Sequence, residues 1–184
     1  MSILIAGLVL WWGAHLFKRL AAGPRAVMGN AGKGIIAVVL VASVVLMVMG
    51  YRGAEGTVYW GRSAALVGIN NLLMLIAFYT YAVGGPKGAR IWLGTKLRHP
   101  QLTGFSIWAV GHLLVNGDMP SFVLFGGLLA WAIVEMLVIN AQDGPWTPPP
   151  RAARKKEIVY IVVTLIVVAV VMVIHNWLGV QPWG

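Results

Sequence analysis

Long apolar runs, separated by short polar loops, constrain the fold of this 184-residue chain more than any other feature. Only 10% of its residues are charged, against about 25% in a soluble domain. In lipid, a helix satisfies every backbone polar group within one segment, and about 20 apolar residues cross the bilayer. The sequence therefore predicts an all-α, polytopic membrane bundle that forms one domain over residues 1–184. Its six expected transmembrane helices span residues 3–20, 34–49, 63–83, 101–115, 121–139 and 157–178.

The basic residues gather in alternate loops. All but two of the 14 Lys and Arg residues follow the first, third or fifth segment, and the exceptions are Arg52 and Arg62. The three basic groups are Lys18, Arg19, Arg25 and Lys33, then Lys87, Arg90, Lys96 and Arg98, then Arg151, Arg154, Lys155 and Lys156. The positive-inside rule places these loops in the cytoplasm and both termini outside it. Topology thus explains the net charge of +9, so the expected partner is the lipid bilayer and not a nucleic acid.

Histidines inside apolar segments are the first candidates for function, because ionisable groups are rare at such depth. At 1.5 Å per residue, His112 lies roughly 15 Å from the cytoplasmic end of its segment. His15 lies roughly 12 Å from the same face of a core about 30 Å thick. His175 falls near the outer face, and His99 falls at the cytoplasmic interface. His15 and His112 are therefore expected to share one level on different helices.

Two imidazoles at one depth suit the axial positions of a haem, whose iron accepts histidine on both faces. Arg98 and Arg19 are candidates for contacts with the propionates. Glu135, the one carboxylate clearly inside an apolar segment, is a candidate for orienting a ligand. The chain has no cysteine, and a zinc site needs three or four ligands in one place. Two alternatives stay open: each histidine bonds to a neighbouring helix or to Glu135, or His99 replaces His15 as the ligand.

A longer motif carries a family resemblance. Arg98-His99-Pro100, then Trp108-Ala109-Val110-Gly111-His112-Leu113-Leu114, then Asn116-Gly117-Asp118, resemble the NnrU family of bacterial membrane proteins. The early helix with His15 before basic residues and the six-segment layout fit the same family. The resemblance implies an inner-membrane protein associated with denitrification, in the expression or function of nitrite and nitric oxide reductases. Proteins of nitrogen-oxide respiration are then the expected partners.

The family is also related to the 15-cis-zeta-carotene isomerase of plants and cyanobacteria, a b-haem membrane enzyme. Its haem ligands are two histidines, one of which has a Trp-x-x-Gly-His context that matches Trp108, Gly111 and His112. The other is matched more loosely by His15, so the resemblance implies haem b on the pair that depth selects. If the chain is an enzyme, it would be a haem-dependent cis–trans isomerase of a carotenoid-like polyene. The isomerases carry a cysteine where this chain has Ala109, so ligand exchange through that thiol has no counterpart here.

Overall fold

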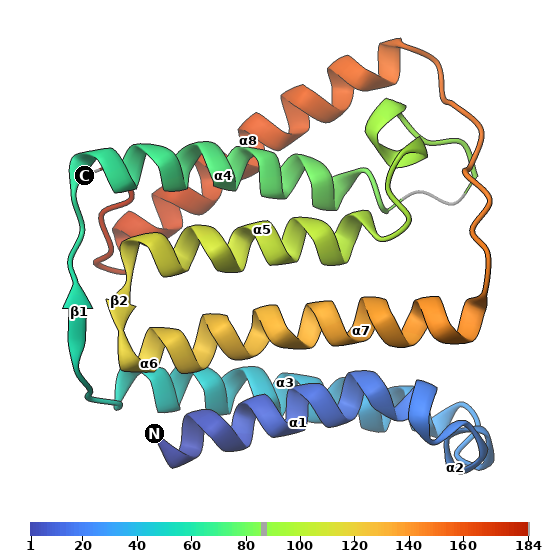
Figure 1. The fold of residues 1–184 in the computed structure, drawn as a ribbon, viewed down its shortest axis with the longest axis horizontal. Coiled ribbons are helices and arrows are strands. Elements are labelled where there is room, and N and C mark those ends of the chain that lie inside the picture. Colours follow the sequence, from blue (N-terminus) through green and yellow to red (C-terminus); the bar gives the residue numbers. More distant parts are fainter. Residues whose placement is uncertain (86–87, 184) are drawn as a thin grey trace. The chain divides into compact units, whose positions relative to one another are not determined.

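The computed structural model describes residues 1–85 and 88–183, and helices dominate it (Figure 1). The long helices are α1 (Ser2–Leu20), α3 (Ala31–Arg52), α4 (Ala64–Ala82), α5 (Pro100–Val115), α7 (Gly127–Asp143) and α8 (Lys155–Trp177). The shorter elements are α2 (Ala22–Val27), α6 (Met119–Ser121), the 3-10 turn η1 (Trp92–Thr95) and the π-helical segment η2 (Phe122–Gly126). The all-helical prediction is confirmed. Lys87, one of the expected loop cations, lies outside the described residues.

Five stretches of the described chain are long and apolar enough to cross a membrane. They are Ser2–Leu20, Ala31–Arg52, Ala64–Ala82, Met119–Asp143 and Lys155–Trp177. The remaining expected segment forms α5, which has 16 residues and a length of about 24 Å at 1.5 Å per residue. That is shorter than a hydrocarbon core of about 30 Å. The structure therefore supports a membrane protein with five candidate spans, one fewer than the six expected.

The contacts divide the chain into two compact units. The first unit comprises Met1–Trp60 and Gly117–Gln142, and the second comprises Gly61–Asn116 and Asp143–Gly184. In the first unit α1 packs against α3 through small residues. A Cβ added at Gly50 would lie 2.6 Å from the Cα of Leu4, so only glycine allows this approach. Small residues play this part in membrane bundles, where close backbone packing replaces the hydrophobic effect.

The first unit also contains a short sheet that the sequence did not reveal. Strand β1 (Val58–Trp60) pairs antiparallel with β2 (Gly117–Asp118). Asp118 then caps α6, because its carboxylate accepts hydrogen bonds from the backbone N–H and the hydroxyl of Ser121, both at 2.9 Å. The Tyr51 hydroxyl shares a 2.8 Å hydrogen bond with the same serine oxygen. Within Asn116-Gly117-Asp118, the last two residues thus form strand β2, and Asp118 also caps the helix that follows.

In the second unit α4 and α5 form an antiparallel pair, and α8 packs on α4. A Cβ at Gly104 would lie 2.6 Å from both the carbonyl oxygen of Ala77 and the backbone nitrogen of Tyr81. Gly104 therefore sets the distance between α4 and α5. After α8 the chain returns to α4, where the side-chain amide of Asn71 donates a 2.9 Å hydrogen bond to the carbonyl of Pro182. Asn71 thus fastens the C-terminal segment to α4.

Candidate functional site

His15 lies among aromatic rings in the first unit. Its imidazole contacts the indole of Trp11, one turn earlier in α1, with ring centroids 4.2 Å apart and the ring planes tilted by 42°. The indole of Trp131 in α7 contacts the same imidazole edge-on at 4.5 Å. Trp12, the neighbour of Trp11, donates a 3.1 Å hydrogen bond from its indole N–H to the carbonyl of Gly127. The two tryptophans of α1 therefore do different work: one contacts the histidine and one fastens α1 to the start of α7.

Glu135 belongs to the same unit, one turn after Trp131 in α7. Its side chain is buried, with 9% of its surface exposed, and it interacts electrostatically with His15. Its Oε2 atom is buried and has no hydrogen-bond partner among the residues that the structure describes. A buried carboxylate oxygen without a donor is costly. The geometry therefore leaves Glu135 able to accept one further hydrogen bond beside His15.

His112 lies in α5 of the second unit, with its ring centroid 4.6 Å from that of Trp108. Gly111 next to it faces α4: a Cβ there would meet the Met74 methyl group and lie 2.9 Å from the side-chain oxygen of Asn70. Ala109, three residues before His112, is fully buried. At this level α5 is therefore closely packed against α4.

The two histidines share one local arrangement. Each follows a tryptophan by four residues, and each Nδ1 hydrogen-bonds to that tryptophan's carbonyl, at 3.0 Å for His15 and 2.9 Å for His112. A carbonyl oxygen can only accept, so the proton must be on Nδ1. In a neutral imidazole the lone pair then belongs to Nε2, which is the atom that a haem iron would bind. The same W-x-x-x-H spacing is visible twice in the sequence, at Trp11 and His15 and at Trp108 and His112.

The structure places the other residues predicted for the site, Arg98, Arg19 and His99, at or next to helix ends. One Arg98 nitrogen donates a 2.7 Å hydrogen bond to the carbonyl of Gly144, which uses one of five guanidinium N–H donors. Arg19 lies in the last turn of α1, and its carbonyl accepts a 2.9 Å bond from the side chain of Gln142. His99 is the residue that precedes Pro100 at the start of α5. The Arg98-His99-Pro100 step thus marks the start of α5.

His175 lies in the last turn of α8. It belongs to the second unit, as His112 does, and the two imidazoles interact electrostatically. The Nδ1 of His175 also bonds to a backbone carbonyl four residues earlier, that of Val171, at 2.8 Å. In this unit α8 runs obliquely to α4 (Figure 1).

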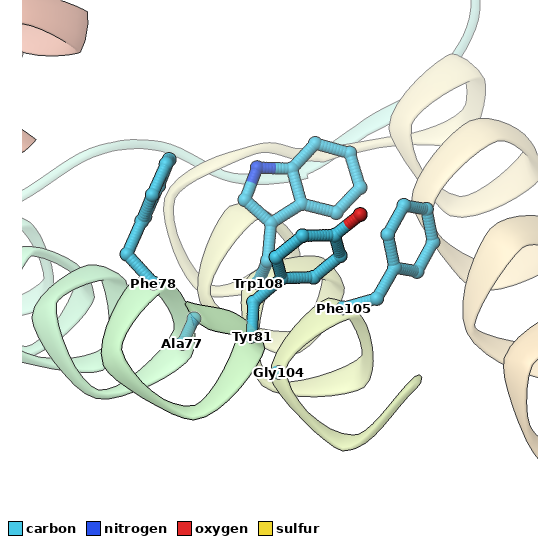
Figure 2. Close-up of a pocket in the computed structure, with 6 residues that line it drawn as sticks. All are labelled: Ala77, Phe78, Tyr81, Gly104, Phe105 and Trp108. Atoms are coloured by element: carbon cyan, nitrogen blue, oxygen red, sulfur yellow. The ribbon is translucent and has the colours of Figure 1, made fainter. Parts of the chain in front are cut away.

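Residues of α4 and α5 line an apolar hollow (Figure 2). Its volume is about 310 Å³. It is lined by Ala77, Phe78, Tyr81, Gly104, Phe105 and Trp108. Small residues make room between four aromatic rings, and the Trp108 ring that borders the hollow also contacts His112. The hollow suits an apolar, flat or chain-like group.

The fold and these residues define a helical membrane protein that presents histidines from apolar helices. No group of three or more His, Cys, Asp or Glu side chains able to hold a metal ion occurs in the part of the chain that the structure describes. The family model of the NnrU protein matches residues 3–182, so the chain belongs to the NnrU family. No curated protein and no solved structure matches the chain.

Proposed function

We propose that this NnrU family member is an integral protein of the bacterial inner membrane that binds a b-type haem through His15 and His112. The observation that carries the proposal is the repeated Trp-to-His arrangement, in which the backbone bond at Nδ1 assigns the lone pair to Nε2. Neutral imidazole is the ordinary axial ligand of haem iron. When bound, the haem would supply electron transfer and the binding of small gases. The contacts that support His15 as a ligand lie within the first unit, and those that support His112 lie within the second.

The surrounding residues fit such a group chemically. Indole rings flank both imidazoles, at Trp11 and Trp131 for His15 and at Trp108 for His112. These ring contacts restrict the orientation of the imidazole planes. Glu135 has an unsatisfied oxygen beside His15, and Arg98 and Arg19 offer cations for propionates. The His15 N–H already donates to the Trp11 carbonyl, which orients the ring. The role proposed for Glu135 is therefore to raise the basicity of the imidazole through its electrostatic interaction with the ring.

We propose a role in nitrogen-oxide respiration, where the protein supports the expression or function of nitrite and nitric oxide reductases. Its support is membership of the NnrU family. A haem with two protein ligands is suited to electron transfer or sensing, in which substrate need not reach the iron. We further propose six spans, with α5 as the short one, and both termini outside the cytoplasm. The support is the distribution of Lys and Arg among the loops.

The alternative is a haem-dependent cis–trans isomerase of a carotenoid-like polyene. The observation that favours it is the hollow between α4 and α5, whose apolar lining reaches Trp108 beside His112. The observation against it is Ala109, which removes the thiol present in the related isomerases.

The first experiment is to express the full chain with haem supplied and to purify it in mild detergent. The proposal predicts a visible spectrum of low-spin haem and a pyridine haemochromogen of the b type, at one haem per chain. A protein that never retains haem would refute the site. Two cell assays then separate the functions: loss of nitric oxide reductase activity in a deletion strain supports the accessory role. An altered ratio of polyene isomers with unchanged reductase activity supports the isomerase.

A further inference from the structure

Basic residues gather at one end of the second unit, where the linker before α8 meets the segment before η1. This basic patch consists of Arg90, Arg151, Arg154, Lys155 and Lys156. Arg90 and Arg151 are partners in a parallel backbone bridge. The Arg90 N–H donates to the carbonyl of Pro150 at 2.9 Å, and the Ala152 N–H donates to the carbonyl of Arg90 at 2.7 Å. The backbone therefore holds two cationic residues side by side.

The Arg90 side chain is packed into the protein and not spread into solvent. A Cβ added at Gly94 in η1 would lie 2.9 Å from the Cβ and 3.1 Å from the Cδ of Arg90. The aliphatic stem thus lies on the glycine of the turn. The Nε atom is buried and has no hydrogen-bond partner within residues 1–85 and 88–183. Because arginine stays charged in proteins, a buried N–H of this kind is costly unless an acceptor binds it.

The local carboxylate cannot supply that acceptor. Glu157 is the only acidic residue between positions 144 and 157. Its Oε1 already accepts the Trp92 backbone N–H at 2.8 Å and lies 3.4 Å from an Arg151 nitrogen, while its Oε2 accepts the Tyr79 hydroxyl at 3.3 Å. Lys155 and Lys156 occupy the first turn of α8, where the helix dipole favours anions. With five cations and one carboxylate, the patch keeps an excess of positive charge.

The position of the patch indicates which anion is available. Trp92 is 51% exposed beside it, and exposed indoles favour the headgroup level of a bilayer. The apolar side chains that follow the patch in α8 are also exposed, with Ile158 at 67% and Val159 at 57%. An anionic group at the patch would thus continue into a surface suited to acyl chains. That combination is the chemistry of a phospholipid.

We propose that the basic patch binds the phosphate headgroup of an anionic phospholipid. Arg90 and Arg151 contact the phosphate, and the acyl chains lie along the exposed side of α8. Basic clusters next to transmembrane helices bind such lipids in general. The site is independent of haem, so it holds whether or not His15 and His112 bind iron.

The test uses the full-length protein in a neutral detergent and measures its melting temperature with added phosphatidylglycerol or phosphatidylcholine. The proposal predicts a rise of about 3 °C with phosphatidylglycerol, as expected for a ligand at about five times its Kd, and little change with phosphatidylcholine. Arg90→Gln and Arg151→Gln should lose most of this rise. Lys33→Gln, which removes one positive charge in the first unit, is the matched control and should keep it.

Three results would overturn the proposal. Equal shifts with both lipids would mean that the acyl chains, and not the headgroup charge, bind. An equal shift with inorganic phosphate would identify a free anion as the ligand. An equal loss in Lys33→Gln and Arg151→Gln would indicate diffuse attraction without a site. If Arg90→Gln fails to fold, Arg151→Gln decides, because the Arg151 side chain is 50% exposed and its replacement leaves no buried gap.

Discussion

Gly104→Ala tests the closest approach between α4 and α5. The added Cβ would lie 2.6 Å from the Ala77 carbonyl oxygen and 2.6 Å from the Tyr81 nitrogen, which are both backbone atoms. A side chain can rotate away from such a contact, but helix backbone cannot. The two helices must therefore separate, and the contacts along the whole α4–α5 interface weaken together.

The magnitude follows from two opposing terms. Overpacking a close contact costs about 1–3 kcal/mol, and a backbone contact belongs at the upper end, near 3 kcal/mol. Alanine in place of glycine raises helix propensity by about 1 kcal/mol. The expected net loss in unfolding free energy is therefore about 2 kcal/mol. Gly68→Ala in α4 is the control, because a Cβ there meets nothing within 4 Å. It should be neutral or stabilising by up to about 1 kcal/mol.

The assay is reversible unfolding of the purified variants in mixed micelles of increasing SDS content, followed by tryptophan fluorescence. Gly104→Ala should unfold at a lower SDS fraction than the wild type, and Gly68→Ala should not. Equal stability of the two variants would refute the close backbone packing of α4 and α5. It would also remove the argument that α5 is positioned by its glycines.

Three further predictions concern topology, a helix cap and a buried carboxylate. A reporter active only outside the cytoplasm should score near Thr57 and be silent near Ala152, and activity at the second site would invert the proposed orientation. Asp118→Ala should lower the unfolding free energy by about 1–2 kcal/mol, because a helix cap is lost, whereas an unchanged midpoint would exclude the cap. Glu135→Gln should perturb haem retention or the spectrum more than Asn70→Ala does, and equal effects would make Glu135 an ordinary packing residue.

The sequence predicted the helices well because each is a long apolar run. Apolar length alone decides where a membrane helix forms, and turn residues such as Gly84 and Gly85 mark where α4 ends. The same criterion could not reveal the strands at Val58–Trp60 and Gly117–Asp118, because two or three residues are too few to show the alternation of apolar and polar side chains that marks a strand. It also missed η2, because a π turn has no composition of its own.

The candidate site was predicted in its residues but not in its local geometry. His15, His112 and Glu135 stood out because ionisable groups are rare in apolar segments. The sequence could not show that Trp131 would contact His15, because that neighbour comes from a helix more than a hundred residues away. Packing, not pattern, decides this neighbour.

Low-temperature EPR and visible spectra of the ferric protein and its histidine variants test whether His15 and His112 bind the haem iron. We expect a six-coordinate, low-spin haem in the wild type without added ligand. His15→Ala and His112→Ala should each give a five-coordinate, high-spin or haem-poor protein, because no thiolate can substitute. His99→Ala and His175→Ala should keep the low-spin signal. If either of these two abolishes it while His15→Ala leaves it intact, His15 is not an axial ligand and the proposed pair is wrong.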